Sequence, residues 1–290
     1  MRKTQGKIMI RITGWAEDAC SSIPSEDVLG SALHENKLTV WAIDGGSTLT
    51  EAAFTTFPDK TDSRWFADEL SRRISMMAAE GSFALPLLAD AIADIRHAYL
   101  TLVDKSGRWF HPVAACVIAE MREIDDRLEI SLHSFADCFF MWGTTQLKHN
   151  HTRTQLSSRS RSAWKACSGF RGKRLEQLRK RREEQQRNEK TSALSLNPKS
   201  AFNCVETNLN FDRPTTLLLG TDGLARAWQR YALLPECEVI DFVAHYGISE
   251  LIDRIREYEA DHLGEDDFTE KRADDAAGMR ICFVPHGKST

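Results

Sequence analysis

Residues 38–46 read Leu-Thr-Val-Trp-Ala-Ile-Asp-Gly-Gly, an apolar run that stops at a carboxylate followed by two glycines. A short apolar run with β-branched and aromatic residues predicts a buried strand, and the Asp-Gly pair predicts a sharp turn at its end. The pattern returns at 215–223, Thr-Thr-Leu-Leu-Leu-Gly-Thr-Asp-Gly. It appears in reverse at 274–284, where Asp274 comes shortly before a final apolar run. Each of these three predicted strands therefore has an aspartate near one end.

The remaining apolar residues predict an α+β layered fold. Helical spacing at 66–77 and 88–102 predicts two helices that each bury one face. Further strands are expected at 7–12, 112–121, 128–132 and 135–142, and further helices at 224–234 and 249–262. Because strands and helices come in separate runs, this order favours a layered sandwich over a doubly wound parallel sheet. We expect one domain over 1–290, with residues 144–210 as a divergent basic insertion.

Composition excludes several classes of protein. The 290 residues are 42% hydrophobic and carry a net charge of −4, so the chain can form a sizeable core and is not basic overall. Seven cysteines without a C-x-x-C spacing predict reduced thiols and a cytoplasmic protein. The N-terminus does not resemble a signal peptide, and no apolar run reaches 18 residues, so no membrane association is predicted.

The three strand-end aspartates, Asp44, Asp222 and Asp274, predict a metal site. A carboxylate at a strand end is held by the rigid sheet and still faces outward. Oxygen ligands without a neighbouring His/Cys cluster favour Mg²⁺ or Mn²⁺ over zinc. Asp-Gly at a strand end is also common in ordinary turns, but three such aspartates in this order favour metal binding.

Six segments resemble motifs of the metal-dependent protein phosphatases of the phosphatase 2C type, in the family's order and in a divergent, bacterial-like form. They are GWAEDACSS (14–22), VWAIDGGSTLTEA (40–52), PVAACVIAEM (112–121), HSFADCFFMW (133–142), TLLLGTDGLARA (216–227) and RADDAAGMRICFV (272–284). The resemblance implies a two-sheet antiparallel β-sandwich flanked by helix pairs. It also implies a hydrolase that removes phosphate from phosphoproteins in signalling.

The resemblance further implies a site with two Mg²⁺ or Mn²⁺ ions. Asp44 would bridge the two ions and thereby be both a ligand and a catalytic residue. Glu17 and the carbonyl of Gly45 would hold one ion, and Asp222 and Asp274 the other. Two cations lower the pKa of water and neutralise the charge that develops on a phosphate ester.

Other roles in the implied site fall on single residues. Asp18 would be catalytic by orienting a metal-bound water, and Asp137 would support a third, weaker metal ion. The family's phosphate-binding arginine is replaced by Thr13, which leaves Arg11 as the predicted phosphate-binding residue. Many relatives have a histidine where this chain has Gly46.

Residues 148–190 carry 14 Lys and Arg against 4 Asp and Glu. The stretch 171–190 predicts a helix that is almost entirely polar, which is typical of a solvated helix. As the family's flap, it would dock a phosphoprotein or another acidic partner. Nucleic acid is less favoured, because only Trp164 and Phe170 could stack on bases. Three functions remain open: a Ser/Thr phosphatase, a catalytically weak scaffold of the same fold, and a nucleic-acid-associated regulator.

Overall fold

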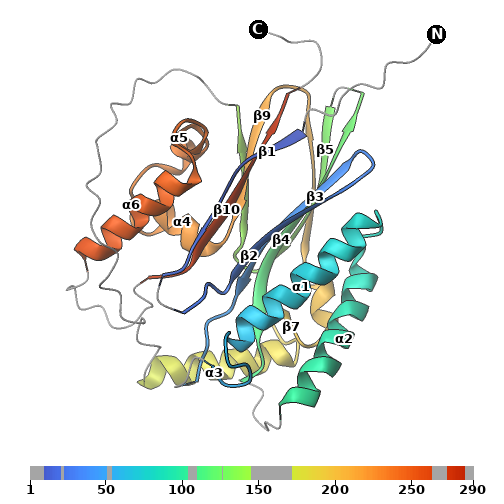
Figure 1. Cartoon of the computed structure of the whole chain (residues 1–290), viewed down its shortest axis with the longest axis vertical. Helices are drawn as coiled ribbons and strands as arrows, with labels where there is room; N and C mark the ends of the chain where they lie inside the picture. Colours follow the sequence, from blue (N-terminus) through green and yellow to red (C-terminus); the bar gives the residue numbers. More distant parts are fainter. Residues whose placement is uncertain are drawn as a thin grey trace.

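The computed structural model describes residues 10–20, 23–50, 54–103, 110–125, 127–144, 172–262 and 273–284. Two antiparallel sheets pack face to face, and helices cover both outer faces (Figure 1). The predicted α+β sandwich with helices on either side is thus confirmed.

The first sheet has four strands in the order β1-β10-β9-β6. Its strands are β1 (Ile10–Asp18), β10 (Ala276–Phe283), β9 (Thr215–Gly220) and β6 (Phe139–Gly143). Its outer face packs against α4 (Asp222–Gln229), α5 (Val239–Tyr246) and α6 (Ile248–Asp261), with a short 3₁₀ turn, η3 (Glu236–Glu238), before α5. The buried side chains of these helices explain the apolar spacing of the C-terminal third.

The second sheet has the order β2-β3-β4-β5-β8, and β7 pairs with β4. Its strands are β2 (Asp27–His34), β3 (Lys37–Gly45), β4 (Val113–Ile124), β5 (Arg127–Phe135), β7 (Leu194–Ser195) and β8 (Val205–Phe211). Its outer face packs against α1 (Asp62–Ala79) and α2 (Leu85–Leu102), and a 3₁₀ turn, η2 (Pro198–Phe202), precedes β8. β2 and β8 are strands that the apolar pattern did not indicate.

The alternation of β3 shows how the layers are joined. Val40 and Ala42 point into the space between the sheets, where they belong to the core that contains Leu217 and Leu219. Trp41 and Ile43 point the other way, into the core formed with α1 and α2. Because successive strand side chains face opposite sides, one strand contributes to two apolar cores. β3 is therefore buried on both faces, and its C-terminal end is held rigidly.

The strand register brings three chain segments to one end of the sandwich. β2 and β3 form a hairpin in which Asp27 pairs with Asp44. β9 ends where β10 begins, with Gly220 opposite Gly278. At the same end lies α3 (Gly172–Gln186), which crosses the lower part of the molecule in Figure 1.

Two further expectations concern thiols and membranes. None of the six cysteines in the described ranges forms a disulfide, whereas Cys167 lies outside these ranges. Among the described helices, none combines the length and the apolar character that a bilayer crossing requires.

Candidate active site

The three aspartates predicted from the strand ends lie together at one end of the sandwich. Asp44 is the penultimate residue of β3, Asp222 is the first residue of α4, and Asp274 comes two residues before β10. All three line one pocket of about 200 Å³. The carboxyl groups lie close enough for the charge of Asp222 to raise the pKa of Asp44, and for that of Asp274 to raise the pKa of Asp222. The sequence pattern therefore located three carboxylates that the fold does bring together.

Their electrostatics show that negative charge is concentrated here. Burial raises the pKa of Asp44 well above its usual range, and the nearby charges of Asp27 and Asp222 raise it further. Burial also raises the pKa of Asp222 to about 6, and the charge of Asp274 adds to this effect. Buried carboxylates that repel one another are costly unless cations neutralise them.

The chemistry of this pocket fits divalent cations with oxygen ligands. Among the described residues, no three of these aspartates have oxygens that all lie within 4.8 Å of one another. The donors of this pocket are carboxylate oxygens, which Mg²⁺ and Mn²⁺ prefer, and Mg²⁺ usually keeps several water ligands. The residues present therefore fit Mg²⁺ or Mn²⁺ bound by carboxylates and water.

Two glycines explain why aspartate is followed by glycine at these positions. A Cβ on Gly223 would lie 1.8 Å from the carbonyl oxygen of Asp275, so only glycine lets the start of α4 pass this backbone. A Cβ on Gly45 would lie 2.9 Å from the carbonyl oxygen of Glu26. The Gly45 amide donates a hydrogen bond to that same oxygen. Close backbone contact, made possible by glycine, thus brings the carboxylates together.

Asp27 is the acidic residue of this cluster that sequence reasoning missed. It is 1% exposed and lies directly opposite Asp44 in the hairpin. Burial raises its pKa well above the usual range, the charge of Asp275 adds to this, and a hydrogen bond from Thr221 opposes it. The hydroxyl of Thr221 donates this bond to Oδ2 of Asp27 over 2.7 Å. A signal in the sequence was the acidic pair Glu26-Asp27, where β2 begins.

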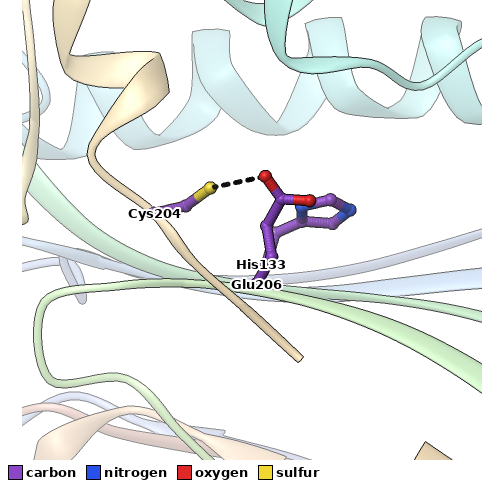
Figure 2. A group of neighbouring side chains, drawn as sticks. All are labelled: His133, Cys204 and Glu206. Carbon is purple, nitrogen blue, oxygen red and sulfur yellow. Dashed lines mark hydrogen bonds between the residues drawn. The ribbon is translucent and has the colours of Figure 1, made fainter. Parts of the chain in front are cut away.

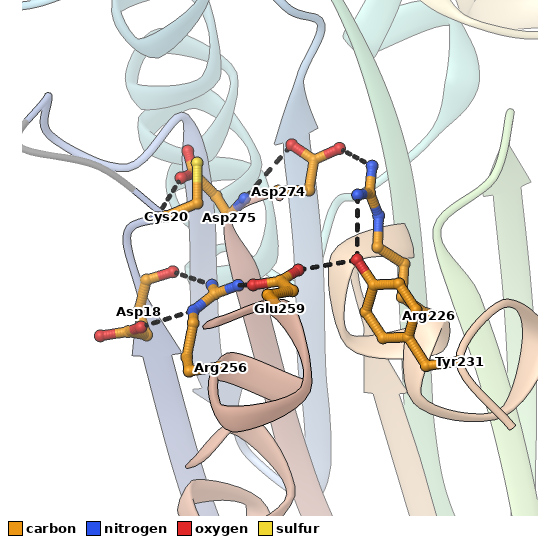
Figure 3. Close-up of polar contacts among 8 residues, drawn as sticks. All are labelled: Asp18, Cys20, Arg226, Tyr231, Arg256, Glu259, Asp274 and Asp275. Carbon is orange, nitrogen blue, oxygen red and sulfur yellow. Dashed lines mark hydrogen bonds and ion pairs between the residues drawn. The ribbon is translucent and has the colours of Figure 1, made fainter. Parts of the chain in front are cut away.

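Asp275 connects the N-terminal loop to this cluster. Its two carboxylate oxygens accept hydrogen bonds from the backbone amides of Cys20, at 2.9 Å, and Glu26, at 2.7 Å. Its own amide donates to Oδ1 of Asp274 at 3.2 Å. Figure 3 shows Asp275 between Cys20 and Asp274. Asp275 therefore positions the backbone on both sides of the pocket.

The predicted Glu-Asp pair lies at the same end of the sandwich but does not line the pocket. Asp18 receives an ion pair from Arg256 Nε at 2.9 Å, as Figure 3 shows, and Glu17 is exposed on β1. Neither lines the pocket. β1 also ends at this end of the sandwich, because Asp18 pairs with Ala276, two residues after Asp274, but the acidic residue directly opposite Asp44 is Asp27 of the hairpin.

The predicted phosphate-binding residue is remote. Arg11 pairs with Cys282 near the end of β10 that is far from Asp274. Seven residues separate Arg11 from Asp18, which is roughly 23 Å along a strand. The pocket therefore contains no contribution from Arg11.

One of the site's carboxylates has a counter-ion within the chain. Arg226, one helical turn after Asp222, places Nη2 2.6 Å from Oδ2 of Asp274. The pair belongs to a chain of polar contacts through Tyr231 and Glu259 to Arg256 (Figure 3). Arg226 thus neutralises part of the negative charge at Asp274.

Asp137 and the basic helix α3 complete the pocket. Asp137, in the turn between β5 and β6, lines it beside the other aspartates, and its charge raises the pKa of Asp222. From α3, Arg181 and Arg182 line the same pocket. The pocket therefore combines four aspartates with two arginines.

The expectation that 171–190 forms a solvated helix is wrong for the last turns of α3. Arg182 is 7% exposed, and its guanidinium donates to the carbonyls of Ser47, at 3.1 Å, and His111, at 3.3 Å. Gln186 is also buried and donates to the carbonyl of Pro112 at 2.9 Å. These bonds are made by polar side chains to main-chain carbonyls, so composition could not reveal the contact. The remaining part of the basic stretch, 148–171, lies outside the described residues.

Comparisons with known proteins agree with this arrangement. No family model and no curated protein matches the sequence. The solved structure of the photosystem II phosphatase PBCP is similar over 95% of this chain and 98% of that one, with a TM-score of 0.52 and 12% identity. A phosphatase from Toxoplasma gondii is similar over 95% of each chain, with a TM-score of 0.51 and 11% identity.

The chain has the phosphatase 2C fold. At such low identity the similarity establishes the fold alone. Within that fold, the carboxylate cluster of this chain lies at the strand ends that its own sequence pattern indicated.

Proposed function

We propose that this protein is a metal-dependent phosphoprotein Ser/Thr phosphatase, that is, a hydrolase of phosphate monoesters. The observation that carries the proposal is the pocket in which Asp44, Asp222 and Asp274 lie together, with raised pKa values at Asp44 and Asp222. Ionised carboxylates this close need cations, and a pocket with cations and guanidinium groups suits a phosphate ester.

Asp44, Asp222 and Asp274 would hold two Mg²⁺ or Mn²⁺ ions, together with the carbonyl of Gly45. Asp137 is the nearest further carboxylate for a third ion. Bound ions of this kind activate water and neutralise charge on the phosphate.

Asp27 is a further candidate for the catalytic role that the resemblance implied for Asp18. Its carboxyl is buried directly beside Asp44 and is fixed by the hydroxyl of Thr221. Burial raises the pKa of Asp27, so this carboxyl takes up a proton more readily than an exposed aspartate and can exchange it with a neighbouring group. Asp27 is therefore the residue best placed for proton transfer at this end of the sandwich.

Arg181 is the residue best placed to bind the substrate phosphate. Its neighbour Arg182 is buried and committed to backbone carbonyls, whereas Arg181 is exposed and lines the pocket. A guanidinium that reaches an anionic substrate from the pocket wall gives a paired, directional contact with phosphate oxygens. The exposed basic residues of α3 would guide an acidic phosphoprotein toward the same opening.

One observation favours the second candidate function, a scaffold of weak activity. Arg226 forms an ion pair with Asp274, and this contact competes with a metal ion for the same carboxylate. If that contact persists, the fold would bind a phosphoprotein without hydrolysing it efficiently.

The decisive experiment measures hydrolysis of p-nitrophenyl phosphate and of a phosphopeptide panel with and without Mn²⁺. We expect activity that depends on Mn²⁺ and is lost in Asp44→Asn and Asp222→Asn. Asp212→Asn is the matched control, because Asp212 is exposed on the loop before β9. Binding of phosphopeptides without turnover would support the scaffold, and unchanged turnover in both site variants would refute the proposed mechanism.

A further inference from the structure

A second group of metal-binding side chains lies outside the pocket, on strands β5 and β8. His133 and Glu206 are directly opposite each other in this antiparallel pair. Cys204 comes two residues before Glu206 and so faces the same side of the sheet. One donor atom from each of the three side chains lies within 4.8 Å of the other two (Figure 2). Three different donor types therefore converge on one point.

The surroundings of His133 suit a metal ligand. Its Nδ1 is buried and has no hydrogen-bond partner in the described structure. Its Nε2 lies 4.0 Å from Oε2 of Glu120, which Lys37 holds through a 2.6 Å ion pair. A histidine that binds a metal through one nitrogen commonly directs the other toward a carboxylate. At 4.0 Å Glu120 is beyond hydrogen-bond distance, so it would have to move slightly closer to take that role, and Nδ1 is left for the metal.

The location separates this group from the carboxylate pocket. The three side chains face the helices, and Phe83, in the connection between α1 and α2, packs 5.2 Å from the ring of His133. None of the three lines the pocket of Asp44. An ion bound here would therefore act on the fold and not directly on a phosphate ester.

We propose that His133, Cys204 and Glu206 bind a zinc ion that fastens the edge strand β8 to β5. A donor set of imidazole, thiolate and carboxylate selects Zn²⁺ over Mg²⁺. Zinc bonds of about 2.0–2.3 Å require the donors to approach slightly, and water supplies the fourth ligand on the exposed side of Glu206. On binding, Cys204 releases its thiol proton to solvent.

The edge strand explains what such an ion would do. β8 ends the sheet, and its first four residues are exposed, with Val205 63% exposed. An edge strand with few buried side chains is weakly held and open to pairing with other chains. A metal shared with β5 would bind only the folded state and so stabilise the pairing.

The test uses the full-length protein with saturating Mg²⁺, which occupies oxygen sites and leaves thiolate sites free. We titrate Co²⁺ and record the thiolate-to-cobalt charge-transfer band, then displace Co²⁺ with Zn²⁺. We expect one Co²⁺ per chain with this band, and its loss in Cys204→Ser and His133→Ala. Cys237→Ser is the control, because Cys237 is exposed and remote in sequence from the group.

A second readout does not depend on a variant that folds. Zn²⁺ should slow alkylation of Cys204 in the wild-type protein, measured by peptide mass spectrometry, and leave alkylation of Cys237 unchanged. Asp44→Asn should keep the band, whereas Glu120→Gln should weaken the site by about tenfold or more. A missing band together with unprotected Cys204 would overturn the proposal, as would a band that persists in Cys204→Ser.

Discussion

The hydroxyl of Thr221 donates a 2.7 Å hydrogen bond to the carboxylate of Asp27, and the two residues are 194 positions apart in the chain. The same hydroxyl accepts a bond from the amide of Ala277 at 3.0 Å. One buried side chain therefore connects the β2–β3 hairpin, the start of α4 and β10. It also stabilises the ionised form of Asp27 against the effect of burial.

Thr221→Val should reveal this connection. The change leaves a buried carboxylate and a buried amide without their partner, which costs about 1–3 kcal/mol of unfolding free energy. The control is Thr39→Val, because the hydroxyl of Thr39 is buried without a partner, and its loss should be neutral or stabilising. Urea unfolding of both variants measures the difference. Equal effects would contradict the role given to Thr221.

The raised pKa values predict a dependence of stability on pH. The folded pKa of Asp222 is about 6, above the usual value of 3.8, so the folded state binds more protons between these limits. Stability that Asp222 contributes below about pH 4 is therefore lost as the pH rises through 6, about 3 kcal/mol without added metal.

The matched variant for that prediction is Asp222→Asn, which does not titrate. Without added metal, its stability should equal that of the wild type near pH 4 and exceed it near pH 7. Mn²⁺ should remove this advantage, because it binds the ionised wild-type site. Urea denaturation at the two pH values, with and without Mn²⁺, measures both effects. An advantage that is independent of pH would point to repacking instead.

Gly223→Ala should damage the site through the backbone. The added Cβ would overlap the carbonyl oxygen of Asp275, so the start of α4 must move away from Asp274. We expect a loss of about 3 kcal/mol or more in stability. At Gly14 a Cβ would have its nearest neighbour, Arg280 Cβ, at 3.5 Å, so Gly14→Ala should cost less than about 1 kcal/mol. Thermal unfolding compares the two variants.

Arg181→Ala and Arg182→Ala should have different effects although the residues are neighbours. Arg182 is buried and bonded to two carbonyls, so its loss should destabilise the protein by about 2–3 kcal/mol. Arg181 is exposed at the pocket, so its loss should leave stability within about 0.5 kcal/mol and lower kcat/KM for a phosphopeptide about tenfold. Kinetics and calorimetry on both variants measure this. A destabilised Arg181→Ala protein would mean that Arg181 holds the helix instead.

The sequence was sufficient to predict the positions of those site residues that directly follow apolar strands. Asp44 and Asp222 follow apolar runs that are buried on both faces, so the pattern indicated both the strand and the position of its last carboxylate. Asp27 begins β2, whose residues include Gly30 and Ser31, and no apolar run marks this strand. Its position opposite Asp44 follows from a tight turn at Glu35, which sets the register of the hairpin. Register of this kind is a property of pairing and not of composition.

The buried contact of helix α3 was missed for a different reason. Charge predicted that α3 is solvated, because charged side chains usually face water. Arg182 and Gln186 are buried because their partners are main-chain carbonyls, and every residue type supplies a carbonyl. Pattern analysis of side chains has no means of detecting such partners.

The attachment of α3 through main-chain carbonyls has a consequence for the evolution of the protein. Because α3 is held by the carbonyls of Leu49, Ser47, His111 and Pro112, the side chains at these positions are not needed for its attachment. Substitutions along these loops can therefore change the shape of the pocket entrance while α3 stays attached beside it. The substrate selectivity of the pocket and the attachment of α3 can therefore change independently during evolution.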